Sequence, residues 1–275
     1  MIWKCRDKSI VFDGKTKIMG IVNLTPDSFS DGGSFDNAEE AVDYALQLLA
    51  DGADIIDLGA QSTRPGYTEI CPEEEWKRLQ PVLFLLRQKT DAPISVDTYF
   101  PFVAEKAAAE GADIINDVSG NLSGEMAEII KKNRLGWVIM HSTAGGVKEV
   151  GNFFSEAITE ATARGVQNEQ LCLDMGIGFG KSTAQNLALL ANTEAYKLQG
   201  IPLLLGTSRK RVIGAGSGEE DPQKRIYGNI AADTAAIFGG ADIIRLHDVR
   251  NEIKGIRMAD ALNAAREKNN GQDNC

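Results

Sequence analysis

The stretch Gly52-Ala53-Asp54-Ile55-Ile56 decides the fold of this chain, because the same five residue types return at residues 111–115 and 240–244. A helical pattern precedes each copy, as at residues 38–50 and 103–110. Glycine commonly ends a helix, and consecutive β-branched residues are typical of a buried parallel strand. A helix-to-strand joint that repeats along a chain is the signature of βα units. The sequence therefore predicts a parallel sheet.

Eight short apolar runs predict the strands of this sheet. They are residues 18–22, 55–58, 94–96, 114–115, 136–140, 171–173, 203–205 and 243–246. Eight parallel strands close a (β/α)8 TIM barrel, whereas a doubly wound open sheet, the rival architecture, rarely needs so many evenly spaced units. Two earlier runs, residues 2–5 and 9–12, predict a short N-terminal β-hairpin that covers the bottom of the barrel.

The composition indicates one globular domain. Of the 275 residues, 43% are hydrophobic and 25% are charged, which is close to globular averages, and no linker or low-complexity stretch divides the chain. We expect a single barrel domain over residues 1–267. Residues 268–275 are polar and lack apolar periodicity, so we expect them to form a disordered tail.

The net charge and the cysteines indicate which binding partners and which cellular compartment suit the protein. A net charge of −10 argues against a nucleic-acid or membrane surface, since both require clustered Lys and Arg. No segment has the apolar length of a signal peptide or a membrane span. The four cysteines are far apart and form no Cys-x-x-Cys pair, which suits a reducing cytosol. We expect a soluble cytoplasmic protein whose anionic ligands bind in a local basic pocket.

A polar residue stands at the carboxyl end of every predicted barrel strand, the rim at which parallel barrels carry their chemistry. In chain order these residues are Asn23, Asp57, Asp97, Asn116 with Asp117, His141, Asp174, Ser208 with Lys210, and Arg245 with His247. One Asp at a strand end is more often a helix cap or a turn former. Eight polar strand ends that converge on one rim are hard to explain by capping alone, so the set predicts a binding or catalytic site.

The most basic part of this rim follows the last two strands. Residues 206–211 include Arg209, Lys210 and Arg211, and the next strand ends with Arg245 and His247. Barrels frequently bind phosphate at these two loops. Basic residues on neighbouring strands focus the electric field into one pocket, which favours an anion site over a solvated basic face. The carboxyl and amide groups opposite suit a flat heterocycle with a donor-rich edge.

Two other readings of the motifs are rejected. Residues 174–182 nearly copy a nucleotide-binding P-loop, but that motif requires Gly where Met175 stands, and the strand-end Asp174 does not belong to it. A metal-dependent hydrolase is also rejected, because the chain has only His141 and His247, on separate strands, and its first barrel strand does not end in paired histidines.

Seven motifs occur in an order that is very unlikely by chance: residues 20–33, 62–66, 95–98, 115–118, 176–181, 208–210 and 245–248. Over essentially its whole length the chain resembles the dihydropteroate synthases. The resemblance implies an enzyme that joins a dihydropterin methyl diphosphate to 4-aminobenzoate and releases pyrophosphate by a dissociative, Mg²⁺-assisted substitution. It also implies a homodimer, for which the alanine-rich residues 230–238 are a candidate interface.

The resemblance also implies a role for each residue of the rim. Asp97, Asn116 and Asp174 would hold the nitrogen-rich edge of the pterin. Met140 would lie against the ring, and Lys210 would bond to it. Those that take the diphosphate or complete this pocket are Arg245, His247, Thr63, Gly206 and Asn23, the last through a bound Mg²⁺. The implied aminobenzoate pocket is Phe29, Thr63, Arg64, Pro65, Phe179 and Ser208. Catalysis is assigned to Asp97, Asp174, Lys210 and Arg245.

Two alternatives and three departures from the family pattern stay open at this point. A methyltetrahydrofolate-dependent corrinoid methyltransferase shares the pterin-edge residues, but it would not need the loops at residues 27–33 and 62–66. A pterin-binding homologue without turnover is the other alternative. The departures are Met175 where the family commonly has Pro, Gln61 where Glu is frequent, and Ser142 where Met or Asn is usual.

Overall fold

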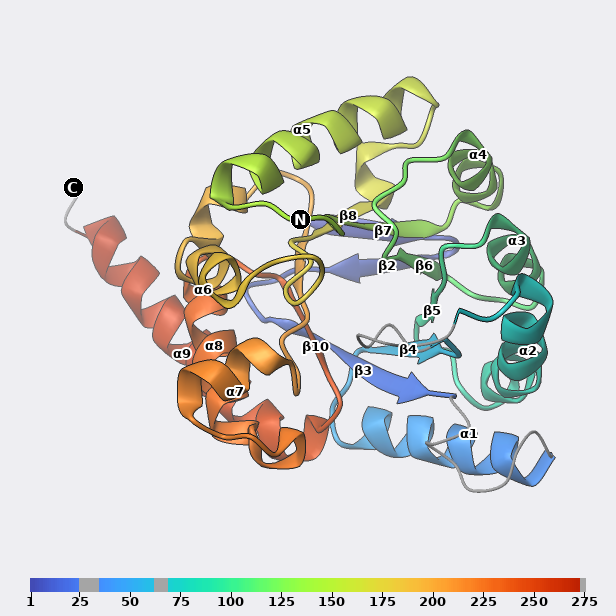
Figure 1. The fold of residues 1–275 in the computed structure, drawn as a ribbon, viewed down its shortest axis with the longest axis horizontal. Helices are drawn as coiled ribbons and strands as arrows, with labels where there is room; N and C mark the ends of the chain where they lie inside the picture. The colour runs from blue at the N-terminus through green and yellow to red at the C-terminus, as the bar shows by residue number, and fades with distance from the viewer. Residues whose placement is uncertain (25–34, 62–68, 273–275) are drawn as a thin grey trace.

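The computed structural model describes residues 1–24, 35–61 and 69–272, with side chains for all of these except residues 35–37 and 267–272. Its central strands are parallel and close into a barrel in the order β10-β3-β4-β5-β6-β7-β8-β9. Helices surround the barrel on its outside (Figure 1). The barrel closes where β10 (Ile243–Leu246) pairs with β3 (Lys17–Asn23). The predicted (β/α)8 barrel is confirmed, and the open sheet is excluded.

The other barrel strands agree with the sequence prediction to within two residues at either end. They are β4 (Ile55–Gly59), β5 (Ile94–Asp97), β6 (Ile114–Asp117), β7 (Gly136–Met140), β8 (Leu171–Asp174) and β9 (Leu203–Leu205). Four strands include the polar residue that the prediction placed just beyond them, namely Asn23, Asp97, Asp117 and Asp174. These side chains therefore stand on hydrogen-bonded strands rather than on loops.

The helices form where the amphipathic stretches predict them. Their bounds are α1 (Phe35–Ala50), α2 (Pro72–Lys89), α3 (Pro101–Ala109), α4 (Gly124–Asn133), α5 (Val147–Ala163), α6 (Thr183–Ala191), α7 (Arg211–Ser217), α8 (Ile226–Phe238) and α9 (Val249–Gln272), with short 3-10 segments η1 (Asn168–Gln170), η2 (Thr193–Tyr196) and η3 (Pro222–Lys224). Ser123 and Ser182 cap α4 and α6 by accepting backbone N–H bonds, as N-cap serines do. Within the described residues, none of the helices is long and apolar enough to cross a membrane.

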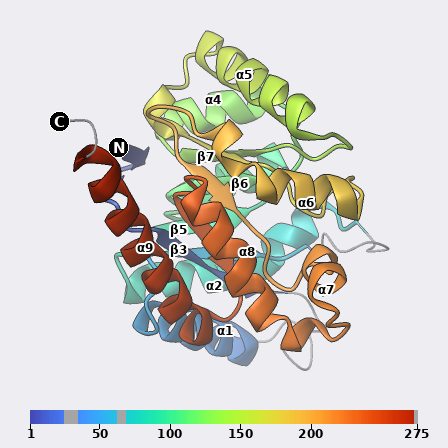
Figure 2. The same cartoon turned by 90° about the vertical axis from the view of Figure 1, so that its left-hand side faces the viewer.

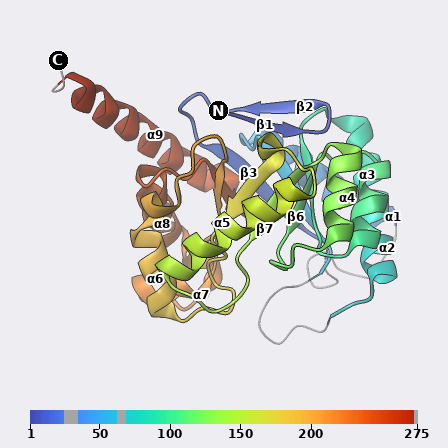
Figure 3. The same ribbon diagram turned by 90° about the horizontal axis from the view of Figure 1, so that it is seen from above.

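Helix α9 continues through Gln272 and so includes the backbone of residues 268–272. A helix that has already formed extends at little cost, because each added residue gains a hydrogen bond without a new nucleus. Figure 3 shows this end of α9 projecting away from the barrel.

The repeated five-residue joint has a physical role at each of its positions. Gly52, Gly111 and Gly240 have φ of +109°, +100° and +97°, which favours glycine strongly and turns the chain from helix to strand. The aspartate two residues later accepts a hydrogen bond from the backbone of the preceding barrel strand. The pairs are Asp54 with Ile18 N (2.8 Å), Asp113 with Ile94 N (2.9 Å) and Asp242 with Leu203 N (3.0 Å). The repeat therefore links each unit to the one before it.

The hairpin of β1 (Ile2–Cys5) and β2 (Lys8–Val11) closes the bottom of the barrel, as predicted (Figure 3). Trp3 is fully buried and packs with inward-facing barrel residues such as Met19 and Val138. Its indole N–H donates to the carbonyl of Gln170 at 2.9 Å. A separate and larger apolar core fills the space between the barrel and its helices. The open end of the barrel is thus opposite the hairpin, at the carboxyl ends of the strands.

Trp3→Ala should lower the free energy of unfolding by about 3 to 5 kcal/mol, because it leaves a cavity under the barrel and an unpaired Gln170 carbonyl. Urea unfolding followed by far-UV circular dichroism measures this loss. The matched control is Ile2→Ala on the same strand, whose side chain is 47% exposed and which should cost under about 1 kcal/mol. Equal losses for the two variants would show that the hairpin does not close a packed core.

Candidate active site

A cluster of charged and polar side chains joins four strands at the rim, namely β4, β5, β6 and β10. Arg245 on β10 lies between two carboxylates, with its Nε 2.6 Å from Asp57 Oδ2 and a terminal nitrogen 2.7 Å from Asp97 Oδ2. Asn116 on β6 donates its amide Nδ2 to the same oxygen of Asp57 at 3.3 Å. Asp57 is fully buried. Sequence reasoning named Asp57 as a polar strand end but gave it no role; its place on β4, next to β5 and Asp97, was the available signal.

Burial and mutual charge set the protonation of this cluster. Burial raises the pKa of Asp97 to about 7; Arg245 opposes this rise, and Asp57 adds to it. Burial alone would lower the pKa of Arg245, but Asp57 and Asp97 outweigh it and raise that pKa above the ordinary arginine value. Arginine therefore stays charged, while Asp97 titrates near neutrality. A buried charge network of this kind is costly to break by removing one partner.

A second charged pair follows β8 and β9. Lys210 donates its Nζ to the carbonyl of Ile177 at 2.5 Å, and the same ammonium lies 4.8 Å from the centre of the Phe179 ring. Burial lowers the pKa of Lys210 to about 8, and Asp174 is the largest influence against this fall. Asp174 in turn accepts from Gly176 N at 2.8 Å, and burial raises its pKa. Both groups are thus poised closer to neutrality than free side chains.

The predicted diphosphate corner brings together the end of β3 and the loops after β9 and β10. Ser208 Oγ accepts from the backbone N–H of His247 at 3.2 Å and lies 3.0 Å from its ring Nδ1. His247 Nε2 is 3.4 Å from Asn23 Nδ2. Gly206 lies between the two basic groups, since a Cβ there would be 3.8 Å from both Lys210 Nζ and Arg245 Cβ. Neighbouring strands β9, β10 and β3 therefore bring these polar and basic side chains together at one part of the rim.

The structure describes some of the remaining predicted site residues and leaves others outside its described part. Met140 is buried at the end of β7, next to β8 and Asp174. Phe179 lies in the loop after β8, against Lys210. Four residues of the predicted aminobenzoate and pterin pockets lie outside the described residues: Phe29, Thr63, Arg64 and Pro65.

The segment that nearly copies a P-loop uses its lysine in another way. Lys181 Nζ donates to three backbone carbonyls, those of His141 (2.8 Å), Gly176 (3.0 Å) and Phe179 (3.2 Å). Burial lowers the pKa of Lys181 to about 8. At Gly176 a Cβ would lie 1.9 Å from the His141 carbonyl oxygen. Lys181 therefore ties the loop after β8 to the end of β7, a role that sequence reasoning missed because its partners are backbone atoms.

Lys181→Met should reduce turnover by about tenfold and stability by about 2 kcal/mol, since three backbone carbonyls lose a charged donor. Steady-state kinetics and urea unfolding measure the two effects. Lys224→Met is the matched control, because that side chain is exposed and pairs with Asp221 on the surface; neither quantity should change beyond error. A variant at Lys181 with normal turnover would show that the loop keeps its shape without the lysine.

The three departures from the family pattern are accommodated internally. Met175 is fully buried in the core between barrel and helices. Gln61 donates to Tyr99 Oη at 2.6 Å and accepts from Ile70 N at 3.0 Å. Ser142 donates to the Ser119 carbonyl at 2.5 Å. None of the three places an unsatisfied polar atom in the rim cluster.

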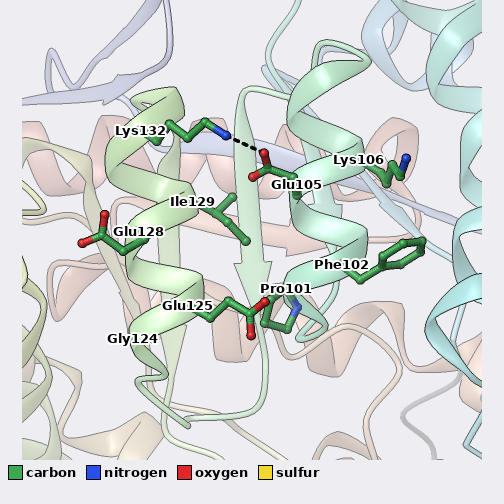
Figure 4. A pocket seen from close by; sticks show the side chains of 9 residues that line it. All are labelled: Pro101, Phe102, Glu105, Lys106, Gly124, Glu125, Glu128, Ile129 and Lys132. Atoms are coloured by element: carbon green, nitrogen blue, oxygen red, sulfur yellow. Dashed lines mark hydrogen bonds and ion pairs between the residues drawn. The ribbon is translucent and has the colours of Figure 1, made fainter.

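A groove of about 630 Å³ lies elsewhere, on the outer wall between α3 and α4 (Figure 4). Lys132 bridges it by donating to Glu105 at 2.7 Å. Its lining is Pro101, Phe102, Glu105, Lys106, Gly124, Glu125, Glu128, Ile129 and Lys132. None of the rim residues lines it, so it is separate from the candidate active site.

Comparison with known proteins defines the class. The family described as pterin binding enzyme matches residues 19–247, a span that runs from β3 to the residue after β10. The chain therefore belongs to the pterin binding enzyme family.

Individual relatives narrow the family further. A dihydropteroate synthase of Synechocystis is 41% identical over 261 residues, covering 90% of each chain. The dihydropteroate synthase of Clostridium difficile, solved in the presence of pteroic acid, is 43% identical with a TM-score of 0.88 over 92% of this chain and 98% of that one. That of Xanthomonas albilineans, solved with 4-aminobenzoic acid, is 40% identical with a TM-score of 0.89 over 96% and 98%. Within its family the chain belongs to the dihydropteroate synthases, which are transferases.

Proposed function

We propose that this chain condenses (7,8-dihydropterin-6-yl)methyl diphosphate with 4-aminobenzoate to give 7,8-dihydropteroate and pyrophosphate. The observation that carries the proposal is the rim itself, where the acidic residues Asp97 and Asp174 face the basic residues Lys210 and Arg245. This arrangement offers acceptors for a donor-rich ring beside cations for a diphosphate. Relatives of high similarity were solved with pteroic acid and with 4-aminobenzoic acid, one resembling the product and one a substrate.

Buried hydrogen-bond acceptors without donors support the proposal that a pterin binds at the rim. Asn116 Oδ1 and Asp57 Oδ1 are buried and have no hydrogen-bond partner in the part of the chain that the structure describes. Buried acceptors in native proteins are nearly always paired, so a ligand with N–H groups is the expected donor. The nitrogen-rich edge of a pterin supplies such groups to Asp97, Asn116 and Asp174. Met140 would contact the ring face, and Lys210 would bond to the ring from the side of β9.

The diphosphate would bind at Arg245, His247 and Gly206, with Asn23 as the protein's ligand to Mg²⁺. Asn23 supplies a neutral amide oxygen, a hard ligand that this ion accepts. Among the described residues no group of three or more His, Cys, Asp or Glu could hold a metal, which fits an ion held mainly by substrate phosphates and water. When bound, Mg²⁺ would neutralise charge on the leaving diphosphate.

The chain's own residues would assist a dissociative substitution. The bond between the pterin methylene carbon and the diphosphate oxygen breaks first, and its electrons leave with the diphosphate toward Arg245 and His247. Asp174 stabilises the positive charge that develops on the pterin, because a fixed carboxylate in a buried site needs no reorganisation. The aniline nitrogen then attacks the methylene carbon, forms the new C–N bond and loses a proton to water. Phe179 and Ser208, together with Phe29, Thr63, Arg64 and Pro65, would shape the pocket for the aminobenzoate.

The first test is a product assay with both substrates and Mg²⁺, in which dihydropteroate is followed by chromatography and pyrophosphate is followed separately. Equal release of the two products is the expected result. Binding of the pterin diphosphate without either product would instead identify a homologue that has lost turnover. Transfer of a methyl group from methyltetrahydrofolate to a corrinoid would identify the methyltransferase alternative.

The enzyme would act as a homodimer in the cytoplasm. Large apolar side chains are exposed on two neighbouring helices: Tyr227 on α8 is 84% exposed, and Met258 and Leu262 on α9 are also exposed. The alanine-rich residues 230–238 belong to α8, which packs against α9. Sedimentation equilibrium should give twice the chain mass, and a monomer at micromolar concentration would overturn this part of the proposal.

A further inference from the structure

Two acidic side chains are buried together behind the rim. Asp233 on α8 and Glu252 on α9 are each only 1% exposed, and these helices lie side by side (Figure 2). Asn229, one turn before Asp233, is buried with them. One oxygen of each residue has no hydrogen-bond partner among the described residues: Asp233 Oδ2, Glu252 Oε2 and Asn229 Oδ1. Three buried acceptors without donors in one place require an explanation.

The surrounding charges do not neutralise the two acids. The charged groups that act on Glu252 are Asp233 from α8, Asp248 from the turn before α9 and Arg209 from the turn after β9, so one cation faces three carboxyls. The polar neighbour of Asp233 on the barrel side is the hydroxyl of Thr207. Two ionised carboxylates in one buried site repel each other and lose hydration, so one of them takes up a proton instead.

We propose that Asp233 and Glu252 share a proton at neutral pH and that this protonated pair positions the turn at residues 206–210, which carries part of the active site. A carboxyl O–H supplies the donor that the buried acceptors lack. The pKa values of the two acids agree with a retained proton. Burial raises the pKa of Asp233 to about 7 and that of Glu252 to about 8, and the charges of Asp233 and Asp248 add to the rise at Glu252.

The hydroxyl of Thr207 connects the Asp233–Glu252 pair to the active site. Thr207 is fully buried, and its Oγ1 donates to Asp233 Oδ1 at 2.7 Å. The Thr207 carbonyl accepts from Lys210 N at 3.0 Å. Between them Arg209 has φ of +61°, in the left-handed region that non-glycine residues rarely adopt, and its carbonyl accepts from Arg225 at 2.8 Å. A turn with this conformation needs fixed contacts on both sides, and Asp233 provides one of them. Asp233 is thus a positioning residue.

The shared proton has a direct thermodynamic signature. A carboxyl whose folded pKa lies above its unfolded value favours folding at low pH, and this stability is lost as pH rises through the folded pKa. For Glu252 the window runs from 4.5 to about 8. Within this window, the equilibrium constant for unfolding increases about tenfold for each unit that the pH rises, for each proton that only the folded state holds.

Urea unfolding of the full chain between pH 5.5 and 7.5 tests this signature. Glu252→Gln keeps the shape of the side chain and removes its titratable proton. The slope of the logarithm of the unfolding equilibrium constant against pH should therefore be smaller than in the wild type by about one decade per pH unit. Asp233→Asn should give the same reduction, which covers the case in which one variant fails to fold. Glu156→Gln, an exposed glutamate on α5, should leave the slope unchanged. Equal slopes in all variants, or stabilisation of the wild type alone by added NaCl or MgCl₂, would overturn the shared proton in favour of ionised acids or a bound cation.

The positioning role is tested separately and rests on the proposed function. Asp233→Asn retains an acceptor for Thr207 and should keep turnover within about twofold, whereas Asp233→Leu should lower kcat by about tenfold or more. Thr207→Val should match the Leu variant, and the double variant should be no worse than either, because all three changes remove one contact. Additive losses would overturn the positioning role. If the wild type makes no product, the proposed function fails, but the unfolding test of the shared proton stands.

Discussion

Arg245→Met should lower the free energy of unfolding by about 3 to 5 kcal/mol at pH 8.5, because it leaves the carboxylates of Asp57 and Asp97 buried without a cation. Product formation should fall below detection, since the same guanidinium faces the diphosphate in the proposed mechanism. The loss of stability should be smaller at pH 6. Without Arg245 the pKa of Asp97 rises above its value of about 7, so below that pH the carboxyl is protonated in the folded state and avoids the penalty.

Urea unfolding at pH 6 and pH 8.5 measures this difference. Arg245→Lys should restore little, because a single ammonium cannot bond the two carboxylates with separate nitrogens as Arg245 does. Arg134→Met is the control for loss of an arginine ion pair: its partner Asp7 and Arg134 itself are exposed, so the change should be under about 1 kcal/mol. A pH-independent loss in Arg245→Met would show that repulsion between the carboxylates is not its cause.

The architecture was predictable from the sequence because its signals are local. A glycine that ends a helix and the isoleucines that follow report on residues only a few positions apart, and three copies of this joint were enough to indicate βα units. The strand ends followed for the same reason. The role of the repeated aspartate was not predictable, since Asp54 binds the amide of Ile18, 36 residues away. Knowledge of the neighbouring strand is needed to assign it.

The composition of the rim was predictable, but its bonding was not. Every strand-end residue was named, yet Asp57 gained its role only when β10 placed Arg245 against it. Lys181 resembled the lysine of a phosphate loop, whereas its partners are carbonyls that no sequence pattern marks. Asp233 and Glu252 lie on the buried faces of α8 and α9, where a sequence pattern predicts apolar residues, and only the tertiary structure reveals partners such as Thr207. In each case the missing information is a tertiary partner.

Asp174→Asn should reduce kcat/KM by about 10²- to 10³-fold with little change in stability. The amide keeps an oxygen that can accept from Gly176 N, as Asp174 does at 2.8 Å, so the loop after β8 stays in place. What is lost is a negative charge beside the pterin, where the proposed transition state gains positive charge, and losses of this size follow removal of one preorganised electrostatic group.

The same substitution should shift the alkaline limb of the pH–rate profile toward lower pH. Burial lowers the pKa of Lys210 to about 8, and Asp174 is the largest influence that opposes this fall. When the carboxylate is removed, the pKa of Lys210 falls further, so the ammonium that steadies the ring is lost at a lower pH. Measurement of kcat/KM from pH 6 to 9.5 tests the shift. Asp117→Asn, a buried strand-end acid that bonds the Ser119 turn, should leave the limb near its wild-type position. An alkaline limb that does not move in Asp174→Asn would mean either that Lys210 does not titrate in the reaction or that Asp174 does not set its charge. The activity of Lys210→Ala separates these two outcomes. If that variant is as active as the wild type, Lys210 has no part in the mechanism.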